Sequence, residues 1–215
     1  MTAPPVNPFD NRDLVASYEN WYETTGRRAD GLEKQLLNQL LTDFPAVGTV
    51  LEVGCGTGHF SRWFEARGLD VVGTDLSMEM LAQSSRLAGP PCVQGRAERL
   101  PFASGSVDLV VIITTLEFVD DPQLALAEAC RVAHKGLLVG SLNRLSPLGR
   151  KLQKRSDPPW TSAKLYTAGE LEALVERATR VHRPRIRWRT TLWPGWRKSL
   201  ALPWGGFIGI SATWK

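Results

Sequence analysis

A cluster of three glycines, Gly54, Gly56 and Gly58, is the feature that most limits how this chain folds. The cluster directly follows the apolar run Thr49–Val53 and opens a helical pattern over residues 59–67. Glycines between a strand and a helix let the backbone bend sharply and approach a ligand closely, and the helix start offers free N–H groups. The pattern therefore predicts a strand–turn–helix unit with a ligand at its turn.

Short apolar runs continue to alternate with helical patterns from residue 49 to residue 141. This alternation is typical of βαβ units, which build a parallel sheet flanked by helices. After the first unit, the expected strands are 71–74, 92–94, 108–113 and 136–140, and the expected helices are 77–87 and 122–132.

The last part of the chain has a different pattern. Thr167 and Glu170 form a capping box, which predicts a helix that runs to about residue 178. Two strand-like segments follow, 185–192 and 207–214, and breaks such as Pro194-Gly195 separate them. We expect these two segments to pair antiparallel and to close one edge of the sheet.

Residues 1–48 precede the first strand and are expected to form an arm and a helical segment, before a single domain over residues 49–215. Prolines in residues 1–13 suggest a loose arm without the pattern of a secretory signal, and residues 31–41 predict an amphipathic helix. The aromatic segment 18–22 lies in too polar a context for a buried core helix. We expect it to be a lid over the ligand cleft, although a permanently docked helix has the same pattern.

Composition limits the class of protein. The chain has 215 residues, of which 43% are hydrophobic and 22% charged, as in a folded globular domain. No apolar run approaches the roughly 20 residues that span a bilayer. Cys55, Cys92 and Cys130 are an odd set without metal-ligand spacing, which predicts no metal site and no disulfide framework and favours a reducing, cytoplasmic location. The oligomeric state stays open.

The residues around the glycines separate three types of ligand. A dinucleotide-binding loop requires glycine where this chain has His59, and a P-loop requires a Gly-Lys-Ser/Thr sequence that does not follow. Glu52 would repel a pyrophosphate but would attract the ammonium and sulfonium of S-adenosylmethionine. Asp75 comes 21 residues after the first glycine, where an acid accepts hydrogen bonds from ribose hydroxyls. Leu76 and Met80 are then placed to pack on the adenine.

Four motifs resemble those of class I S-adenosylmethionine-dependent methyltransferases. In chain order they are LEVGCGTG, GTDLSMEML, GRAERLPFASGSVDLVV and TTLEFVDDP. The resemblance covers about residues 20–176, is strongest over 49–140, and is closest to the small-molecule type that includes the ubiquinone and menaquinone methylases. It implies an α/β Rossmann-like three-layer sandwich, with a seven-stranded, mainly parallel sheet whose last strand is antiparallel. It also implies methyl transfer to a small-molecule acceptor.

The resemblance also implies where the cofactor lies. The glycines would line its methionine half, the Ala97 N–H would meet the adenine ring, and Thr114 would lie by the methionine amine. Relatives often have an aspartate for the adenine amine where this chain has Arg96, so Glu98 is the expected substitute. The full set of expected cofactor contacts is Glu52, Gly54, Gly56, Gly58, Asp75, Leu76, Met80, Ala97, Glu98 and Thr114.

Methyl transfer requires alignment, exclusion of water and, for weakly acidic acceptors, removal of a proton, so a distinct catalytic signature is not expected. Asp157-Pro158-Pro159-Trp160 spells a tetrapeptide of adenine-N6 and related amino methyltransferases. In those enzymes it directly follows strand four, whereas here it follows strand five, so we interpret it as a coincidence. The acceptor-side candidates are Tyr18, Tyr22, His59, Glu117 and Tyr166.

Two alternatives to a small-molecule enzyme remain. Residues 144–198 hold fourteen lysines and arginines against four acids, and Arg183, Arg185, Arg187 and Arg189 alternate along an expected strand. Such a row is either a phosphate-binding stripe of an RNA methyltransferase or the solvated face of an edge strand. The other alternative is a scaffold that binds the cofactor without turnover.

Overall fold

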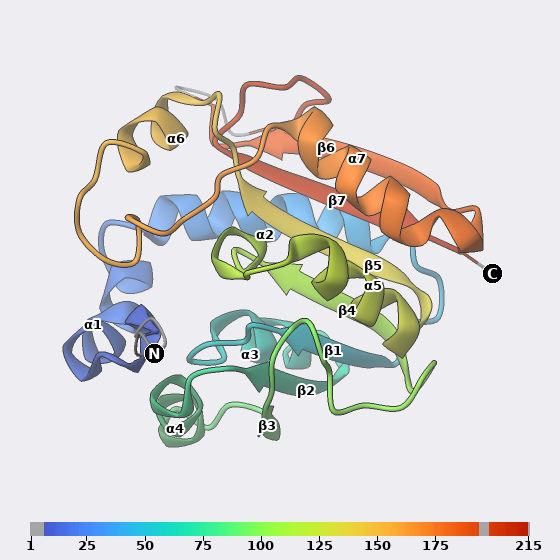
Figure 1. Cartoon of the computed structure of the whole chain (residues 1–215), viewed down its shortest axis with the longest axis horizontal. Helices are drawn as coiled ribbons and strands as arrows, with labels where there is room; N and C mark the ends of the chain where they lie inside the picture. Colours follow the sequence, from blue (N-terminus) through green and yellow to red (C-terminus); the bar gives the residue numbers. More distant parts are fainter. Residues whose placement is uncertain (1–6, 194–197, 215) are drawn as a thin grey trace, which may run out of the picture.

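The computed structural model describes residues 7–193 and 198–214, and its centre is a seven-stranded sheet in the order β3-β2-β1-β4-β5-β7-β6 (Figure 1). Strand β7 runs antiparallel to both of its neighbours, and the remaining strands are parallel to one another. This confirms the predicted mainly parallel sheet with an antiparallel last strand. The predicted break at Pro194-Gly195 lies outside the described residues. The strands are β1 Thr49–Val53, β2 Asp70–Asp75, β3 Cys92–Gln94, β4 Val107–Ile113, β5 Ala133–Leu142, β6 Arg185–Thr191 and β7 Phe207–Thr213.

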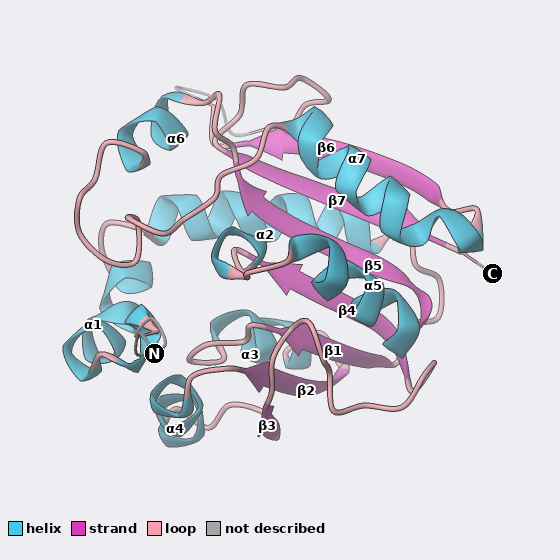
Figure 2. Cartoon of the chain, viewed as in Figure 1, coloured by secondary structure: helices cyan, strands magenta, loops and turns pink. Residues whose placement is uncertain are grey.

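Helices cover both faces of the sheet, which makes three layers (Figure 2). No helix in the described part of the chain is long and apolar enough to cross a membrane. The α-helices are α1 Arg12–Glu23, α2 Arg27–Leu41, α3 His59–Glu65, α4 Met78–Arg86, α5 Pro122–Val132, α6 Pro147–Leu152 and α7 Ala168–Thr179, and the 3₁₀ turns are η1 Pro8–Asp10, η2 Leu116–Phe118 and η3 Arg180–His182.

Side-chain caps fix the helix starts that the sequence predicts. The Ser77 hydroxyl accepts a hydrogen bond from the Met80 N–H at 3.2 Å and begins α4. Asp121 caps α5 by accepting from two backbone N–H groups, each at 3.0 Å. Thr167 and Glu170 form the predicted capping box of α7. These caps satisfy N–H groups that a helix start otherwise leaves unpaired.

Strand β4 divides the core into two halves because its successive side chains point to opposite faces. Val110 and Ile112 pack with α5 and α7 on one face. Leu109, Val111 and Ile113 pack with α2 and α3 on the other. All five side chains are buried, as expected for a central parallel strand with helices on both sides.

The start of the chain is more ordered than the sequence suggests. Residues 7–13, expected to belong to a loose arm, form η1 and the first turn of α1. Asn7 caps η1, the Phe9 ring packs edge-on against Phe118 at 5.0 Å, and the Phe9 carbonyl accepts from the Ser77 hydroxyl at 2.7 Å. These contacts hold η1 at the carboxyl end of β2, and they explain why the prolines do not leave this segment loose.

Candidate active site

In the glycine loop between β1 and α3, Gly54 and Gly58 are packed closely against other side chains and Gly56 is open. Gly54, Gly56 and Gly58 have φ values of +72°, +53° and +77°, which side chains rarely adopt. A Cβ atom on Gly54 would come within 2.2 Å of the Thr115 hydroxyl, so this glycine allows β1 and the tip of β4 to approach. At Gly56 the nearest atom to a Cβ would be the Met80 sulfur at 3.9 Å. The loop therefore presents an open backbone surface at Gly56.

Asp75 joins the end of β2 to this open surface. Its Oδ2 accepts a hydrogen bond from the Gly56 N–H at 2.9 Å, and its Oδ1 accepts from the Ser77 N–H at 2.8 Å. Burial raises the pKa of Asp75, and these backbone donors oppose that rise. The carboxylate that the sequence assigns to the ribose thus lies directly beside the glycine loop.

Glu52 lies beneath the loop at the end of β1, with 2% of its surface exposed. Its Oε2 accepts a hydrogen bond from the Ser61 hydroxyl on α3. Burial raises the pKa of Glu52 to about 8, because a low-dielectric environment disfavours the charged form. The structure therefore gives Glu52 a buried partner within the protein.

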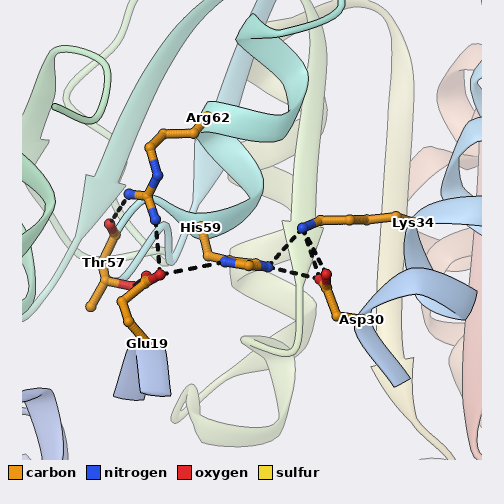
Figure 3. Close-up of polar contacts among 6 residues, drawn as sticks. All are labelled: Glu19, Asp30, Lys34, Thr57, His59 and Arg62. Atoms are coloured by element: carbon orange, nitrogen blue, oxygen red, sulfur yellow. Dashed lines mark hydrogen bonds and ion pairs between the residues drawn. The ribbon is translucent and has the colours of Figure 1, made fainter. Parts of the chain in front are cut away.

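Helix α1 is tied to the glycine loop through Glu19 (Figure 3). The Glu19 carboxylate accepts hydrogen bonds from the Thr57 hydroxyl and, at 3.0 Å, from Arg62 Nη2. Arg62 also donates through Nη1 to the Thr57 carbonyl at 2.7 Å. Burial alone would raise the pKa of Glu19, but the bonds from His59, Thr57 and Arg62 lower it to about 2. Glu19 is thus held as a carboxylate.

His59 extends this network to helix α2. Its Nε2 lies 2.7 Å from Asp30 Oδ1, Lys34 Nζ lies 2.9 Å from the same carboxylate, and the imidazole stacks on Tyr22 with ring centroids 3.6 Å apart. Burial would lower the pKa of His59, but the bonds to Asp30 and Glu19 outweigh it and raise the pKa. We call the six residues Glu19, Asp30, Lys34, Thr57, His59 and Arg62 the latch.

A cavity of about 1300 Å³ lies beyond the carboxyl ends of β4 and β5. Helices α1 and α2 form one side of it, and α6 with the loop after it forms the other. Tyr18, Tyr22 and Trp160 supply aromatic surface, while Thr114 and Leu142 mark the ends of the two strands. The carboxyl edge of a parallel sheet is the usual place for a ligand in such folds.

Two of the five acceptor-side candidates, Tyr18 and Tyr22, line this cavity. They stand one helical turn apart on α1, with ring centroids 5.7 Å apart in an edge-to-face arrangement. Burial raises the pKa of Tyr18 to about 12 and that of Tyr22 well above its usual value. Both are therefore neutral phenols. The third candidate, His59, belongs to the latch.

The structure does not bring the remaining two candidates to the cavity. Glu117 is fully buried, and its Oε1 accepts from the Ser141 hydroxyl at 2.8 Å and from the Leu142 N–H at 2.7 Å. Burial raises the pKa of Glu117 to about 7. Tyr166 packs in the core on the α5 and α7 face and donates to the Leu116 carbonyl at 3.1 Å. Both side chains are held by contacts within the core, which sequence patterns do not reveal.

The loop after β3 uses its polar groups within the protein. Glu98 accepts from the Asp120 N–H at 3.1 Å, and Arg96 forms an ion pair with the Asp120 carboxylate at 2.8 Å. Ala97 is half-buried against the core on the α5 and α7 face. The Glu98 carboxylate, expected as the substitute contact to adenine, thus connects two loops at the carboxyl edge of the sheet.

Thr114, the last of the expected cofactor contacts, has an unusual backbone. Its φ of +48° is rare for a β-branched residue, and such conformations persist mainly at functional sites. Its N–H donates to the Gly140 carbonyl at 2.8 Å, which fixes the turn at the tip of β4. Of the two residues expected against adenine, Leu76 is 44% exposed and Met80 is buried beneath the loop.

Five of the six latch residues were not predicted from the sequence, and neither were Glu33 and Trp160 in the cavity. Glu19 gave no signal, because its partner Arg62 lies 43 residues away. Trp160 lines the cavity although the tetrapeptide that contains it follows α6 and not β4. Glu33 did leave a signal, since it shares the i, i+3, i+4, i+7 spacing of a buried helix face with Leu36, Leu37 and Leu40.

Comparisons with known proteins agree with this architecture. A family model described as a methyltransferase domain matches residues 51–139. A crystal structure from Thermotoga maritima, described as an S-adenosylmethionine-dependent methyltransferase and possible histamine N-methyltransferase, superposes with a TM-score of 0.82. It is 29% identical, and the match covers 97% of this chain and 100% of that one.

Two curated relatives extend the comparison. An uncharacterized protein of Methanocaldococcus jannaschii is 30% identical over 152 residues, which is 70% of this chain and 68% of that protein. The malonyl-[acyl-carrier protein] O-methyltransferase of Pectobacterium atrosepticum is 36% identical over 111 residues, which is 48% of this chain and 44% of that enzyme. The chain thus spans less than half the length of the second relative. With this fold, this glycine loop and these relatives, the chain belongs to the class I S-adenosylmethionine-dependent methyltransferases, with S-adenosylmethionine as its cosubstrate.

Proposed function

We propose that this chain methylates a small molecule that binds in the cavity between α1 and α6. The observation that carries the proposal is the position of this cavity, which begins at Thr114 on the tip of β4 and is bounded by side chains on several sides. Its volume of about 1300 Å³ exceeds the roughly 300–1,000 Å³ of common ligand pockets, so it has space for an acceptor beside the cosubstrate.

The residues at the glycine loop fit S-adenosylmethionine. The open backbone at Gly56 allows the methionine half to approach, and the adjacent Asp75 carboxylate is placed to accept from the ribose hydroxyls. Glu52 lies buried at the end of β1 beside this loop, and its carboxyl group would take up a negative charge most readily next to the ammonium and sulfonium of this ligand. The 96–98 loop and Leu76 lie along the same edge of the sheet for the adenine.

S-adenosylmethionine supplies a methyl group that its sulfonium has already activated. The tasks left to the protein are alignment of the acceptor, exclusion of water and control of its proton. We assign alignment to Thr114 and the cavity walls, and water exclusion to α1, which carries Tyr18 and Tyr22 over the cavity. In this assignment residues 1–48 act as a lid, and residues 49–215 form the catalytic domain.

The latch supports the lid assignment. Glu19 binds Thr57 and Arg62, so α1 contacts the glycine loop itself and not a remote surface. Closure of α1 and the shape of the cofactor loop are therefore coupled. Elements that close over a substrate commonly have low stability of their own and are held by a few contacts of this kind.

The structure weakens the RNA alternative. Two of the four alternating arginines are engaged within the protein: Arg187 pairs with Asp43 at 2.7 Å, and Arg189 donates to the Ser199 carbonyl at 2.7 Å. Arg187 and Arg189 are therefore less available to bind phosphate groups. Of the four alternating arginines, Arg183 and Arg185 are exposed. The non-catalytic scaffold differs from our proposal only in turnover.

The descriptions of the relatives name different acceptors, a malonyl carrier protein in one case and histamine in another. They therefore support a small or carrier-linked acceptor without selecting one. The narrower resemblance to ubiquinone and menaquinone methylases stays a prediction.

Transfer of a labelled methyl group tests the proposal. The protein is incubated with methyl-labelled S-adenosylmethionine and with either the dialysable fraction or the RNA of a bacterial extract. We expect label in dialysable molecules and none on RNA. Label on RNA alone would establish the RNA alternative. Cosubstrate binding without transfer to either fraction, or to the protein fraction that contains carrier-linked acceptors, would support the scaffold.

A further inference from the structure

Glu33 is the exception among the three acidic side chains buried around the cavity and the glycine loop. Glu52 has the Ser61 hydroxyl as its partner, and Glu117 has the Ser141 hydroxyl. Glu33, on α2, is 6% exposed and lines the cavity, and no group in residues 7–193 and 198–214 donates a hydrogen bond to its carboxylate. In the described residues Glu117 Oε2 is sealed in the core without a partner, whereas the Glu33 oxygens are not sealed, so the Glu33 carboxylate opens to the cavity and a ligand there can reach it.

The charges around Glu33 do not supply the missing partner. Burial raises the pKa of Glu33 to about 8, and the nearby Asp30 and Glu117 carboxylates raise it further. His59 and Lys34 oppose the rise, but both are bound to Asp30 within the latch. The inner end of the cavity therefore has an unmatched preference for positive charge.

The walls near Glu33 are aromatic. Tyr18, Tyr22 and Trp160 line the same cavity, and the charge of Glu33 contributes to the raised pKa of both tyrosines. The faces of aromatic rings attract cations, and proteins use cages of such rings to bind organic ammonium groups. The Arg155 guanidinium, which also lines the cavity, lies 5.9 Å from the Trp160 ring and is paired with Asp157.

We propose that Glu33 binds the amino group of the methyl acceptor, so that the acceptor is an organic amine with an apolar or aromatic body. This inference rests on the proposed function. The ammonium group would enter the inner end of the cavity and pair with the Glu33 carboxylate, while the apolar body would pack on the aromatic walls. Glu33 would then both hold the acceptor and receive its proton.

The proton balance of this step is simple. The ammonium gives one proton to the Glu33 carboxylate, which leaves a neutral amine and a neutral carboxylic acid. The nitrogen lone pair then forms a bond to the methyl carbon as the carbon–sulfur bond breaks, and the electron pair of that bond stays on sulfur. The products are an N-methylammonium and S-adenosylhomocysteine. Burial favours the transfer, because it raises the pKa of a carboxyl group and lowers that of an ammonium.

Glu33 is better placed for the acceptor than for the ammonium of the cosubstrate. It shares the cavity with Leu142 at the end of β5 and with Trp160 after α6. The open glycine Gly56 and Asp75 lie at the ends of β1 and β2, on the other side of β4 in the strand order. The test below separates these two roles.

The test compares the wild type with Glu33→Gln, and uses Glu176→Gln on the exposed face of α7 as the matched control. Glutamine has the shape of glutamate but cannot ionise or accept a proton, so the variant is expected to fold, which its melting temperature checks. Each protein is saturated with S-adenosylhomocysteine and titrated with a panel of arylalkylamines, including 2-phenylethylamine. The matching alcohols, including 2-phenylethanol, are titrated in parallel, and methyl transfer is measured with S-adenosylmethionine.

We expect at least one amine to bind the wild type and the control roughly tenfold or more tightly than its alcohol, the effect of one charge-assisted hydrogen bond. Glu33→Gln should abolish this difference and N-methylation, while its affinity for S-adenosylhomocysteine stays within about twofold. Amines that bind no better than alcohols, or an unchanged preference in the variant, would overturn the proposal. Loss of S-adenosylhomocysteine affinity alone would assign Glu33 to the cosubstrate. Methylation of alcohols only would reject the amine but leave the proposed function intact, whereas absence of any transfer would reject both.

Discussion

Glu19 on α1 and Arg62 on α3 form an ion pair of 3.0 Å across 43 residues of sequence, directly over the glycine loop. Both side chains are mostly shielded from solvent, and Thr57 binds both of them. The helix that covers the cavity is thereby fixed to the loop at which the cosubstrate is expected. This contact makes the position of the lid dependent on the conformation of the cofactor loop.

The latch predicts that cosubstrate binding protects α1. Because Thr57 lies in the loop, a bound ligand that orders the loop will also stabilise the contacts of Glu19. We expect slower hydrogen exchange over Arg12–Glu23 when S-adenosylhomocysteine is present. Glu19→Gln should weaken that ligand by roughly fivefold, the loss of about 1 kcal/mol, whereas the exposed Glu23→Gln should not. Equal exchange rates with and without ligand would show that α1 is ordinary packing.

Substitution of Asp75 is expected to weaken the binding of S-adenosylhomocysteine by removing contacts to its ribose. Asp75→Ala removes an acceptor for the ribose hydroxyls and for the Gly56 N–H. Hydrogen bonds to a charged acceptor contribute about 1.5–3 kcal/mol each, so titration calorimetry should show at least about tenfold weaker binding of S-adenosylhomocysteine. Asp70→Ala, at the exposed opposite end of β2, serves as the control. An unchanged dissociation constant in a folded Asp75→Ala protein would remove Asp75 from the site.

Two glycine variants separate packing from ligand contact. A Cβ atom at Gly54 would collide with Thr115, so Gly54→Ala should lower the melting temperature strongly. Gly56→Ala has room for its methyl group and costs only about 1 kcal/mol for its positive φ, but it fills the surface that the cosubstrate approaches. We expect it to stay folded and to lose affinity for S-adenosylhomocysteine. A folded Gly56→Ala protein with wild-type affinity would show that the cosubstrate does not approach the backbone at Gly56.

The fold followed from local signals that the structure preserves. Ser77, Asp121 and Thr167 cap the predicted helices because capping depends on residues within one turn. The buried run of β4 and the two C-terminal strands followed from patterns equally local to the chain. The ends of the strands were predicted less well. Strand β5 spans Ala133–Leu142, which is longer than the apolar run at 136–140.

The site was harder to predict because its contacts are not local. Glu117 and Tyr166 have the chemistry of acceptor contacts, but core partners distant in sequence hold both of them. Glu19 looked like a solvated acid in a polar segment, and only the fold brings Arg62 to it. Glu33 was visible as an acid in a leucine stripe, yet its unmatched charge depends on which donors the tertiary structure supplies.

The buried charge of Glu33 predicts a specific dependence of stability on pH. Its pKa is about 8 in the folded protein and about 4.5 when exposed, so between these values the unfolded chain is ionised while the folded chain retains the proton. The ligand-free protein should therefore lose stability as pH rises from about 4.5 to 8, with no further change from this group above 8. In urea titrations at pH 5 and pH 8, Glu33→Gln should reduce this loss by on the order of 1–3 kcal/mol. The same loss in the variant would contradict the assignment. Part of the loss of stability with rising pH should remain in Glu33→Gln, because burial also raises the pKa values of Glu52 and Glu117.

Binding calorimetry with three ligands tests the central claim, that the glycine loop and Asp75 form a site for S-adenosylmethionine. The acid beneath the loop and His59, which stands where a dinucleotide-binding loop has its third glycine, disfavour a pyrophosphate. A cationic methionine end is compatible with both residues. The wild-type protein should bind S-adenosylmethionine and S-adenosylhomocysteine with comparable affinity and release no measurable heat with NAD. Saturable binding of NAD, with neither adenosyl compound bound, would contradict the account.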